Sequence, residues 1–557
     1  MDLGKTCRAS KYAIGVALSI LLFVSGAEAT NLIDSCTTIS EPGEYVLDRS
    51  IMNSSSSSCI NITSSNVFFN GSGNTIDGVY AWFTNTYGVY VYSPTKTLTN
   101  VTIKNLNVTE WYYGIYYRNA TEGIIENNNA NSNSYNGIYL SSSSDIFLTS
   151  NYASSNRYYG IELLSSNNNT LYNNQARLNG GYGYDISSSG YGIYLLSSNN
   201  NTLKNNYVSS NGNGLGLESF SSNNTLTNNN ANSNEIIGIG LVGSGGNNNL
   251  TNNSMNNNSN NFVALESLDG YSDSSIEISN TIDGKPIFYI KNVVDAIYDS
   301  STNAGTFYCI RCNNVTIRDL NVTKNVFGIS IILTNNSKIE NISASSNVFG
   351  IGLYGFNNNN TITNNKASAN NYGIFLGYYN NNNTLINNNV STNHDGIILG
   401  DYNYFNTITY NNASSNVNGI SLSTGNRNNS IINNYVSSNR VRGIFFYEDN
   451  YDNRIYHNNL INNTNQASGA TAANLWDSGH PGGGNYWSDY NGTDVNNDGI
   501  GDTPYNISGG WMVKDRYPFM RMNGWMPQQT VTVTPGFEIL WVIFSVVIVF
   551  FLKRIRL

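Results

Sequence analysis

Charged side chains are scarce in this chain. Asp, Glu, Lys and Arg make up 11% of its 557 residues, and only three residues are histidine. The charges are also unbalanced, because 36 acidic residues stand against 27 basic ones and the formal net charge is −9. A domain that binds nucleic acid carries a basic patch or stripe. The composition therefore disfavours nucleic acid as a partner, and we expect none.

Long apolar runs are missing except at the two ends of the chain. The first of them lies in residues 1–29, where three basic residues precede the apolar stretch 13–24 and Ala27-Glu28-Ala29 forms a small-x-small cleavage site. This order of features is typical of a secretory signal peptide. We therefore predict that the protein is secreted.

The second apolar run covers residues 539–552 and is followed by Lys553, Arg554 and Arg556. Counted from Phe537 it is shorter than the roughly 20 residues that cross a bilayer as a helix. A buried core helix is the alternative, but the terminal position and the basic flank favour a membrane segment over residues 537–557. Basic flanks stay in the cytoplasm, so we expect an extracellular ectodomain anchored at the cell surface.

Cysteine is rare, with five residues in the chain. Removal of the signal peptide leaves Cys36, Cys59, Cys309 and Cys312, which have three possible pairings in an oxidising exterior. We favour a Cys36–Cys59 disulfide that staples the N-terminal cap. The Cys309/Cys312 pair is open to three interpretations: a local disulfide, two buried thiols, or half of a metal site. No second Cys pair accompanies it, which disfavours zinc.

What the chain does contain is a Gly-Ile pair that returns about every 23 residues. In the second half the steps are 22, 23, 23, 23 and 24 residues. A fixed period in this range is typical of stacked-repeat folds. The pair begins at Gly114, Gly137, Gly160, Gly192, Gly214 (with Leu215) and Gly238, and again at Gly328, Gly350, Gly373, Gly396, Gly419 and Gly443.

Each repeat alternates apolar and polar residues over three to five positions between bends rich in Gly, Asn and Ser, which is a strand period. We therefore predict an all-β fold: a right-handed parallel β-helix of ~23-residue coils with N- and C-terminal caps. A leucine-rich horseshoe fits the period, but its helical segment and Leu spacing are absent.

Stacked coils also predict columns of identical side chains. The isoleucines of the Gly-Ile pairs would form an inward ladder. Asparagines such as Asn365, Asn388, Asn411 and Asn434 would form an amide column at a bend, where we expect a left-handed backbone.

The repeat pattern also sets the domain boundaries. A longer duplication relates Asn74-Thr75-Ile76-Asp77-Gly78 to Asn280-Thr281-Ile282-Asp283-Gly284, which indicates two tandem modules. The predicted segments are a signal peptide (1–29), an N-terminal cap with the first coils (30–95), repeat block 1 (96–265), degenerate connecting coils (266–313), repeat block 2 (314–465), a C-terminal cap (466–527), a linker (528–536) and a transmembrane tail (537–557).

Two groups of side chains are candidates for chemistry or binding. His394, Asp395 and Arg442 lie on the last coils and are the catalytic candidates, because cleavage of an acidic polysaccharide needs a proton-transferring group and a cation; ordinary solvated loop charge is the alternative. Aromatic faces spaced by one coil are candidates for stacking on sugar rings, although tyrosines can also simply cover coil edges. The aromatic candidates are Tyr354, Phe375, Tyr378, Tyr379, Tyr402 and Tyr447.

The segment from Asp494 to Asp502 matches the first nine positions of a calcium loop. Its oxygen ligands would come from the side chains of Asp494, Asn496, Asp498 and Asp502 and from the backbone carbonyl of Ile500. The twelfth position is Tyr505 and not the usual Glu, so a structural Ca²⁺ ion and a plain polar turn are both open. Asn-x-Ser/Thr triplets recur along the chain and predict some glycosylation.

The coils resemble the parallel β-helix repeats of the NosD-like, carbohydrate-binding and sugar-hydrolase superfamily, especially archaeal surface proteins. The resemblance is most specific in the stretches 484–490, 501–505 and 283–287. NosD itself is associated with copper delivery during maturation of nitrous oxide reductase. That role is not expected here, because three scattered histidines and no Met or Cys cluster give copper no ligand set.

The tail also resembles a known signal. Pro535-Gly536-Phe537, followed by the apolar segment and Lys553-Arg554, is similar to the archaeal PGF-CTERM sorting signal. The resemblance implies cleavage by an archaeosortase and attachment to a membrane lipid. Our leading hypothesis is an anchored envelope or adhesion component that binds cell-envelope or extracellular glycans; the alternative is a polysaccharide lyase, hydrolase or epimerase on the same scaffold.

Overall fold

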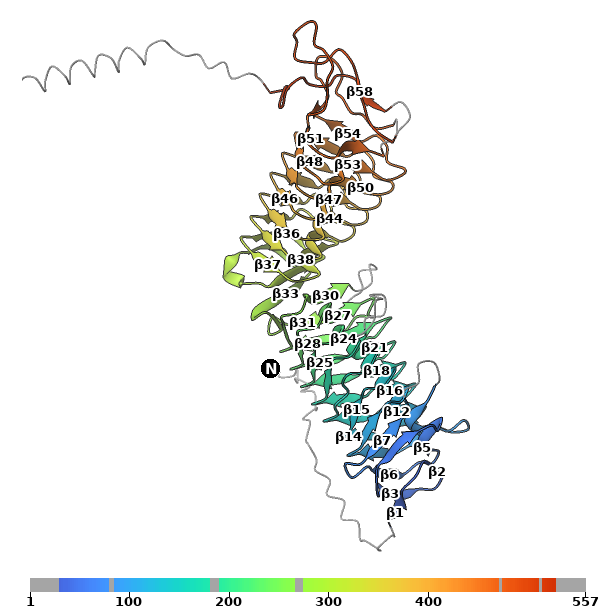
Figure 1. The fold of residues 1–557 in the computed structure, drawn as a ribbon. Helices are drawn as coiled ribbons and strands as arrows, with labels where there is room; N and C mark the ends of the chain where they lie inside the picture. The colour runs from blue at the N-terminus through green and yellow to red at the C-terminus, as the bar shows by residue number, and fades with distance from the viewer. Residues whose placement is uncertain are drawn as a thin grey trace, which may run out of the picture.

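The computed structural model describes residues 30–79, 85–180, 190–265, 274–469, 473–509 and 513–526. Short strands joined by tight bends stack coil upon coil into an elongated parallel β-solenoid (Figure 1). Helical structure in the described residues is confined to one 3₁₀ turn, η2 (Ser300–Thr302). The predicted all-β parallel β-helix is therefore confirmed.

Three parallel sheets form the walls of the first half. The first contains β1 (Asn31–Ile33), β3 (Gly43–Leu47), β6 (Val67–Asn70), β10 (Val101–Lys104), β14 (Ile124–Glu126), β17 (Phe147–Thr149), β19 (Thr170–Tyr172), β22 (Thr202–Lys204), β25 (Thr225–Thr227), β28 (Asn249–Thr251) and β31 (Ser275–Ile276). The second carries the Gly-Ile pairs: β2 (Thr37–Ile39), β5 (Ser58–Ile62), β8 (Tyr87–Val91), β12 (Tyr113–Arg118), β16 (Asn136–Ser141), β18 (Tyr159–Leu164), β21 (Tyr191–Leu196), β24 (Asn213–Glu218), β27 (Ile237–Val242) and β30 (Asn260–Leu265). The third wall contains β4 (Ile51–Ser54), β7 (Thr75–Gly78), β11 (Asn107–Thr109), β15 (Asn129–Asn131), β20 (Gln175–Arg177), β23 (Tyr207–Ser209), β26 (Asn230–Asn232), β29 (Ser254–Asn256) and β32 (Thr281–Ile282).

The second half repeats this arrangement. Its Gly-Ile wall contains β33 (Lys285–Lys291), β35 (Thr306–Ile310), β38 (Phe327–Ile332), β41 (Phe349–Leu353), β44 (Tyr372–Leu376), β47 (Asp395–Leu399), β50 (Asn418–Leu422), β53 (Arg442–Phe446) and β56 (Asn465–Ser468). The next wall contains β34 (Val294–Tyr298), β36 (Asn313–Arg318), β39 (Lys338–Glu340), β42 (Thr361–Thr363), β45 (Thr384–Ile386), β48 (Thr407–Thr409), β51 (Ser430–Ile432) and β54 (Arg454–Tyr456). The last contains β37 (Asn321–Thr323), β40 (Ser343–Ser345), β43 (Lys366–Ser368), β46 (Asn389–Ser391), β49 (Asn412–Ser414), β52 (Tyr435–Ser437), β55 (Asn459–Ile461) and β57 (Tyr486–Trp487). Two-residue strands complete the set: β9 (Leu98–Thr99) with β13 (Ala120–Thr121), and β58 (Tyr505–Asn506) with β59 (Lys514–Asp515).

The two halves meet at an antiparallel pair. β32 pairs with β33 through Thr281↔Pro286 and Ile282↔Lys285, across a turn in which Asp283 and Gly284 have φ of 46° and 77°. The Gly-Ile wall of the second half therefore continues the third wall of the first half, whereas the Gly-Ile wall of the first half ends at β30. The buried residues form two core clusters. The first fills the first half and extends across this junction to residues of β33, β35 and β38, and the second fills the rest of the second half.

Aliphatic and amide ladders fill the coils as predicted. Ile374 and Ile397 pair in register on neighbouring strands and are fully buried. The Asn365 Nδ2 donates to the Asn388 Oδ1 at 2.9 Å, and the Asn388 Nδ2 donates to the Asn411 Oδ1 at 2.9 Å. The buried amides thus satisfy one another from coil to coil.

One detail of the amide column differs from the prediction. The left-handed residue at the bend is the one before each ladder asparagine, such as Asn364 (φ 55°) or Asn387 (φ 57°). The ladder residues themselves do not have positive φ. An exposed Asn takes the left-handed conformation, which it tolerates well, and its buried neighbour supplies the hydrogen bonds.

The glycine of each Gly-Ile pair is required by close stacking of the backbone. A Cβ atom on Gly396 would lie 2.6 Å from the carbonyl oxygen of Gly419 and 2.8 Å from the amide nitrogen of Asn416. Both contacts are too short for any side chain. The repeat period therefore reports where consecutive coils approach most closely.

The cysteines form two disulfides. Cys36 is joined to Cys59 with a Cα–Cα distance of 4.3 Å, and Cys309 is joined to Cys312 at 5.9 Å. Cys59 lies on β5, so the first bond links neighbouring coils at the N-terminal end. Of the three interpretations of the Cys309/Cys312 pair, the structure shows the local disulfide.

No helix within the described ranges is long and apolar enough to cross a membrane. The signal peptide (1–29) and the tail with Pro535, Gly536, Phe537 and the segment 537–557 lie outside the described residues. Both stay predictions from the sequence.

Candidate functional site

A continuous array of tyrosines covers the outside of the Gly-Ile wall in the first half. Parallel pairing places equivalent side chains above one another: Tyr90 pairs with Tyr116, and Tyr116 pairs with Tyr139. Ring centroids of Tyr116 and Tyr139 are 4.6 Å apart, and those of Tyr87 and Tyr113 are 5.7 Å apart. We call this array the tyrosine face; it consists of Tyr87, Tyr90, Tyr112, Tyr113, Tyr116, Tyr135, Tyr139, Tyr158, Tyr159, Tyr191 and Tyr194.

The tyrosine face was missed by the sequence analysis, although the signal was present. Tyr116, Tyr139 and Tyr194 each follow a Gly-Ile pair directly, and Tyr113, Tyr159 and Tyr191 each precede one. In a strand whose isoleucine points inward, the residue directly after it points outward. Counting outward as well as inward positions would have found the column of Tyr116, Tyr139 and Tyr194. The tyrosines before the pair are two positions from the isoleucine, so alternation does not predict that they face outward.

Glu162 interrupts the tyrosine column in its centre. It lies on β18, in register between Tyr139 and Tyr194, and is only 7% exposed. Its Oε2 accepts a hydrogen bond of 2.5 Å from the Nδ2 of Asn136. Burial raises the pKa of this carboxyl to about 7, against the lowering effect of the Asn136 hydrogen bond. The face therefore contains an acid that exchanges its proton near neutral pH.

A second carboxylate lies at the far end of the same face. Glu218, on β24, accepts hydrogen bonds from the hydroxyls of Tyr191 at 2.6 Å and Tyr194 at 2.9 Å. At the opposite end, the Arg118 guanidinium lies 4.8 Å from the centre of the Tyr92 ring. The tyrosine face thus combines ring surfaces, phenol hydroxyls and two acceptors.

The structure brings the three catalytic candidates to one wall of the second half. The Nδ1 of His394 lies 3.0 Å from the Oδ2 of Asp395, which is buried. The other oxygen, Oδ1, accepts hydrogen bonds from Asn418 at 2.8 Å and Ser421 at 3.1 Å. Asp395 therefore holds the His394 ring, whose side chain is 60% exposed.

Arg442 lies two strands farther along the same outward column. Asp395 pairs with Asn418, and Asn418 pairs with Arg442. The Arg442 guanidinium rests 3.9 Å from the centre of the Phe445 ring and forms no ion pair with an acidic residue among those the structure describes. It is therefore available to an anionic ligand.

The predicted aromatic residues fall into separate groups. Tyr354 contacts Phe375 and Tyr378 with ring centroids 6.5 and 6.3 Å apart. Tyr379 and Tyr402 instead form an exposed column with Phe356, with centroids 5.3 to 5.4 Å apart.

Tyr447 belongs to neither group and packs edge-on against Phe445 at 4.5 Å. In the Phe356 column the rings stack on one another, so their faces are largely used within the column and the ring edges meet solvent.

In the calcium-type loop, the side-chain oxygens are engaged by the backbone. Asp494 accepts from the N–H groups of Asp498 and Gly499, and Asp502 accepts from that of Val495. The Oδ2 of Asp498 also lies 3.0 Å from the Nε2 of His480, and its hydrogen bonds with His480 and Ile500 lower the pKa of the Asp498 carboxyl. The loop is thus compact and rich in acceptors around a single bend.

Copper does not fit the residues present. Across the described ranges, no three His, Cys, Asp or Glu side chains come close enough to hold a metal ion. The four cysteines are consumed in disulfides, and His394, His457 and His480 make separate contacts. Soft or imidazole ligands are what copper requires.

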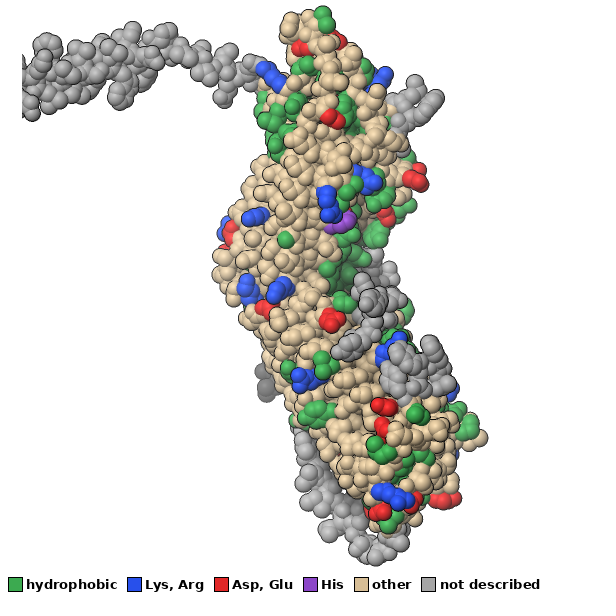
Figure 2. Space-filling model, viewed as in Figure 1, with side chains coloured by type: hydrophobic (Ala, Val, Ile, Leu, Met, Phe, Trp, Pro, Cys, Tyr) green, Lys and Arg blue, Asp and Glu red, His purple; other side chains and the backbone are tan. Residues whose placement is uncertain are grey.

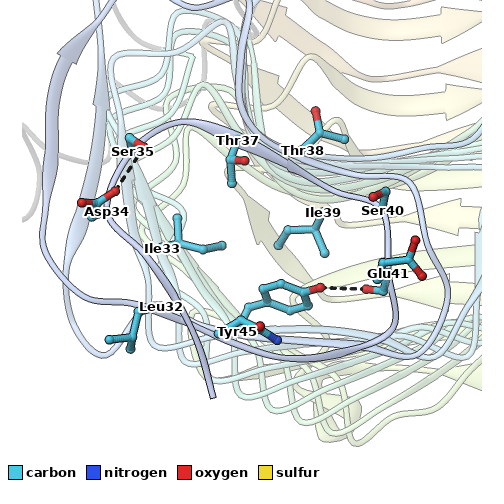
Figure 3. A pocket seen from close by; sticks show the side chains of 11 residues that line it. Leu32, Ile33, Asp34, Ser35, Thr37, Thr38, Ile39, Ser40, Glu41 and Tyr45 are labelled. Carbon is cyan, nitrogen blue, oxygen red and sulfur yellow. Dashed lines mark hydrogen bonds between the residues drawn. The ribbon is translucent and has the colours of Figure 1, made fainter. Parts of the chain in front are cut away.

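A pocket of about 260 Å³ lies at the N-terminal end of the solenoid. Figure 3 shows Ile33 and Ile39 pointing into it, with the hydroxyl of Tyr45 bonded to the backbone of Glu41 at the rim. Leu32 beside it is 67% exposed. The pocket is the uncovered end of the core, and its acidic residues Asp34 and Glu41 lie on the exposed rim, so we do not assign function to it.

The surface outside these sites is largely uncharged. Figure 2 shows scattered charges on a mostly polar surface, with apolar side chains gathered along one edge of the second half. On the face in view, the apolar side chains along this edge are the feature that stands out from the polar surface.

Comparisons with known proteins agree with this architecture. Residues 278–492 match the family model described as "Periplasmic copper-binding protein (NosD)", and residues 87–190 and 185–304 match "Right handed beta helix region". No curated protein sequence matches the chain.

Among solved structures, the chain is similar to the mannuronan C-5 epimerase AlgE6 A-module of Azotobacter vinelandii, with 11% identity over 79% of this chain and 89% of that one and a TM-score of 0.28. The Dettilon tailspike protein gives 16% identity over 60% of each chain and a TM-score of 0.33. PfbA, a surface adhesin of Streptococcus pneumoniae, gives 11% identity over 78% and 85% and a TM-score of 0.25. These values are too low for any argument to rest on them. The matched parts of the chain are right-handed parallel β-helices, and residues 278–492 are NosD-like.

Proposed function

We propose that this protein binds glycans along the outside of its Gly-Ile walls. The observation that carries the proposal is the tyrosine face, which extends over consecutive strands from β8 to β21. Because many of these rings stack on one another, the face presents mainly ring edges and hydroxyls, which suit a sugar with C–H and hydroxyl groups. Repetition of the array from coil to coil suits a polymer better than a single small molecule.

Binding of purified polysaccharides to the ectodomain tests this proposal. Replacing Tyr113 and Tyr135, both half-buried members of the tyrosine face, with Ala removes rings from its middle. We expect affinity to fall by at least about tenfold, since aromatic contacts of this kind are worth about 1 kcal/mol each. The matched control is Tyr379→Ala together with Tyr402→Ala in the separate Phe356 column. Equal losses in both double variants would point away from the tyrosine face and toward the second half.

The location of the protein is part of the same proposal. We place it outside the cell, anchored through residues 537–557, as an envelope or adhesion component whose tail is processed by an archaeosortase. Support comes from the sequence: the basic, apolar and small-residue order in 1–29 and the Pro535-Gly536-Phe537 triad before an apolar run. Replacing the triad with Ala should leave a larger, unprocessed form, which electrophoresis of membrane fractions would detect.

A second candidate function is proton transfer on an acidic polysaccharide in the second half. The specific observation is the His394–Asp395 pair, in which a buried carboxylate holds an exposed imidazole, with Arg442 in the same column. An imidazole held in this way can take a proton from a sugar carbon beside a carboxylate that an arginine neutralises. Turnover of uronate polymers that disappears in His394→Ala and Arg442→Ala would support an enzyme; unchanged turnover would contradict this assignment.

We also propose that the loop from Asp494 to Asp502 holds a structural Ca²⁺ ion. The spacing of Asp494, Asn496, Asp498 and Asp502 and the carbonyl of Ile500 supply oxygen ligands of the type that Ca²⁺ prefers. Binding would require these oxygens to exchange backbone N–H groups for the ion and the three aspartates to move closer together than they lie in the described structure.

A further inference from the structure

Glu162 is the one carboxyl group in the middle of the tyrosine face, and its surroundings disfavour a negative charge. The phenols of Tyr113, Tyr135, Tyr139, Tyr159 and Tyr194 surround it, and burial raises the pKa of each of them, so all are uncharged at neutral pH. In the part of the chain that the structure describes, no Lys or Arg forms an ion pair with Glu162. A buried carboxylate without a cation is costly.

Two charged residues, Arg157 and Glu218, lie next to the tyrosines that surround Glu162. Arg157, in the bend before β18, has its guanidinium 5.5 Å from the centre of the Tyr158 ring. Glu218 on β24 reaches the set through the Tyr194 hydroxyl. Among the described residues, neither Arg157 nor Glu218 contacts Glu162, so neither of them offsets the cost of ionising its carboxyl through a direct interaction.

An amide oxygen without a hydrogen-bond partner lies beside Glu162. The Oδ1 of Asn136 is buried and has no hydrogen-bond partner, while the Nδ2 of the same amide donates to Glu162. Rotating the amide by half a turn exchanges the two atoms. A protonated Glu162 can then donate to the Asn136 oxygen, which pairs the orphaned acceptor. The same half turn places the Asn136 Nδ2 where the oxygen had no partner, so one atom of the amide stays unpaired in either state. The Asn136–Glu162 pair is therefore suited to both protonation states of the carboxyl.

We propose that Glu162 selects the ligands of the tyrosine face by charge. With Glu162 neutral, the face accepts uronic-acid glycans as well as uncharged ones. With Glu162 ionised, it repels the acidic glycans and retains the uncharged ones. This inference rests on the proposed glycan binding and adds the residue that decides between ligand classes.

The test compares one polymer in two charge states. Polygalacturonate and its methyl ester share a backbone but differ in charge, and binding of each is measured at about pH 5.5 and about pH 8.5, on either side of the Glu162 pKa of about 7. We expect the dissociation constant for polygalacturonate to rise about tenfold at the higher pH, as two like charges a few ångströms apart imply. The methyl ester should bind equally at both.

Two variants make the result specific. Glu162→Gln keeps the shape and the hydrogen-bonding capacity and should bind polygalacturonate at both pH values as the wild type does at the lower one. Glu126→Gln removes an equal charge from an exposed position on β14, in another wall, and should behave as wild type. If Glu162→Gln still loses affinity at the higher pH, the proposal is wrong.

Failure of glycan binding by the tyrosine face can be distinguished from failure of the charge selection by Glu162. If neither polymer binds the wild type at either pH, glycan binding by this face is contradicted for galacturonans. The protonation of Glu162 is then read without ligand, from the pH dependence of unfolding. Identical pH profiles for wild type and Glu162→Gln would overturn the inference on that reading as well.

Discussion

At the scale of single residues, Glu162 couples the stability of the fold to pH. Its pKa in the folded chain is about 7, above the ordinary value of 4.5, because the carboxyl is buried. A group whose pKa is raised by folding stabilises the fold while both states are protonated, and that contribution is lost as the pH rises through the folded pKa. The relevant window is therefore the interval from the ordinary carboxyl value up to neutrality.

We expect the free energy of unfolding to fall by about 3 kcal/mol across this window, at about 1.4 kcal/mol per unit of pKa. Urea unfolding at a series of pH values measures it. Glu162→Gln should lack this contribution and keep that of Asp515, whose pKa burial also raises to about 7, whereas Glu126→Gln should follow the wild type. A wild-type curve that runs parallel to that of Glu162→Gln would contradict the burial argument.

The amide ladder gives a second prediction for a single residue. Asn388 accepts from the side chain of Asn365 at 2.9 Å and donates to Asn411 and to the carbonyl of Ile362, both at 2.9 Å. Asn388→Ala leaves buried donors and acceptors without partners, so we expect a loss of about 3 kcal/mol in unfolding free energy. Urea midpoints of the purified variant provide the measurement.

The neighbouring residue is the matched control. Asn387 is left-handed, with φ of 57°, a conformation that glycine adopts freely. Asn387→Gly should change stability by less than about 0.5 kcal/mol. Comparable losses in the two variants would mean that the ladder contributes no more than the bend does.

At the scale of elements, the calcium-type loop can be tested by stability. An ion that binds only the folded loop raises the unfolding free energy by about 2.7 kcal/mol at a hundredfold excess over its Kd. We therefore expect Ca²⁺ to raise the melting temperature of the C-terminal segment, and Asp494→Asn with Asp498→Asn to abolish the rise. Glu448→Gln, at an exposed bend nearby, should leave it intact. A rise that persists in the double Asp variant would place the ion elsewhere.

The sequence predicted those elements that a period specifies. Ile374 and Ile397, and Asn365 and Asn388, recur at one phase of the repeat, so their burial and stacking follow from the spacing alone. The antiparallel turn at Asp283-Gly284 could not be predicted from spacing, because the period is absent between the two blocks. The repeat pattern predicts how one coil follows another, but it contains no information on where the strand direction changes.

The candidate sites were predictable to a lesser degree. The sequence singled out His394, Asp395 and Arg442, and the structure places them on one outward wall. Glu162 was not found, because its significance comes from burial among rings and not from residue type. The sequence around a single Glu does not predict whether its side chain is buried among aromatic rings.

At the scale of the whole molecule, the two core clusters predict two unfolding steps. The first cluster reaches past the junction only as far as Phe327, and β32 and β33 pair through only two residue pairs. In a solenoid, stability is a sum of local and nearest-neighbour contributions, so a weak interface separates cooperative units. We expect calorimetry of the ectodomain to resolve two transitions.

Single-residue variants identify which transition belongs to which block. Glu162→Gln at high pH should shift only the transition of the first block, and Asn388→Ala only that of the second. A single transition that shifts in both variants would show that the two halves unfold as one cooperative unit.

The amide and isoleucine ladders make each inner coil interchangeable with its neighbours. Removing a stretch of 23 residues, the step from Asn365 to Asn388, would place Asn365 against Asn411 with the same donors and acceptors facing each other. Such a protein would be one coil shorter, and the remaining contacts between coils would be unchanged. The length of the rod, and so the height at which it displays its tyrosines, can therefore be changed in fixed increments without redesigning any contact.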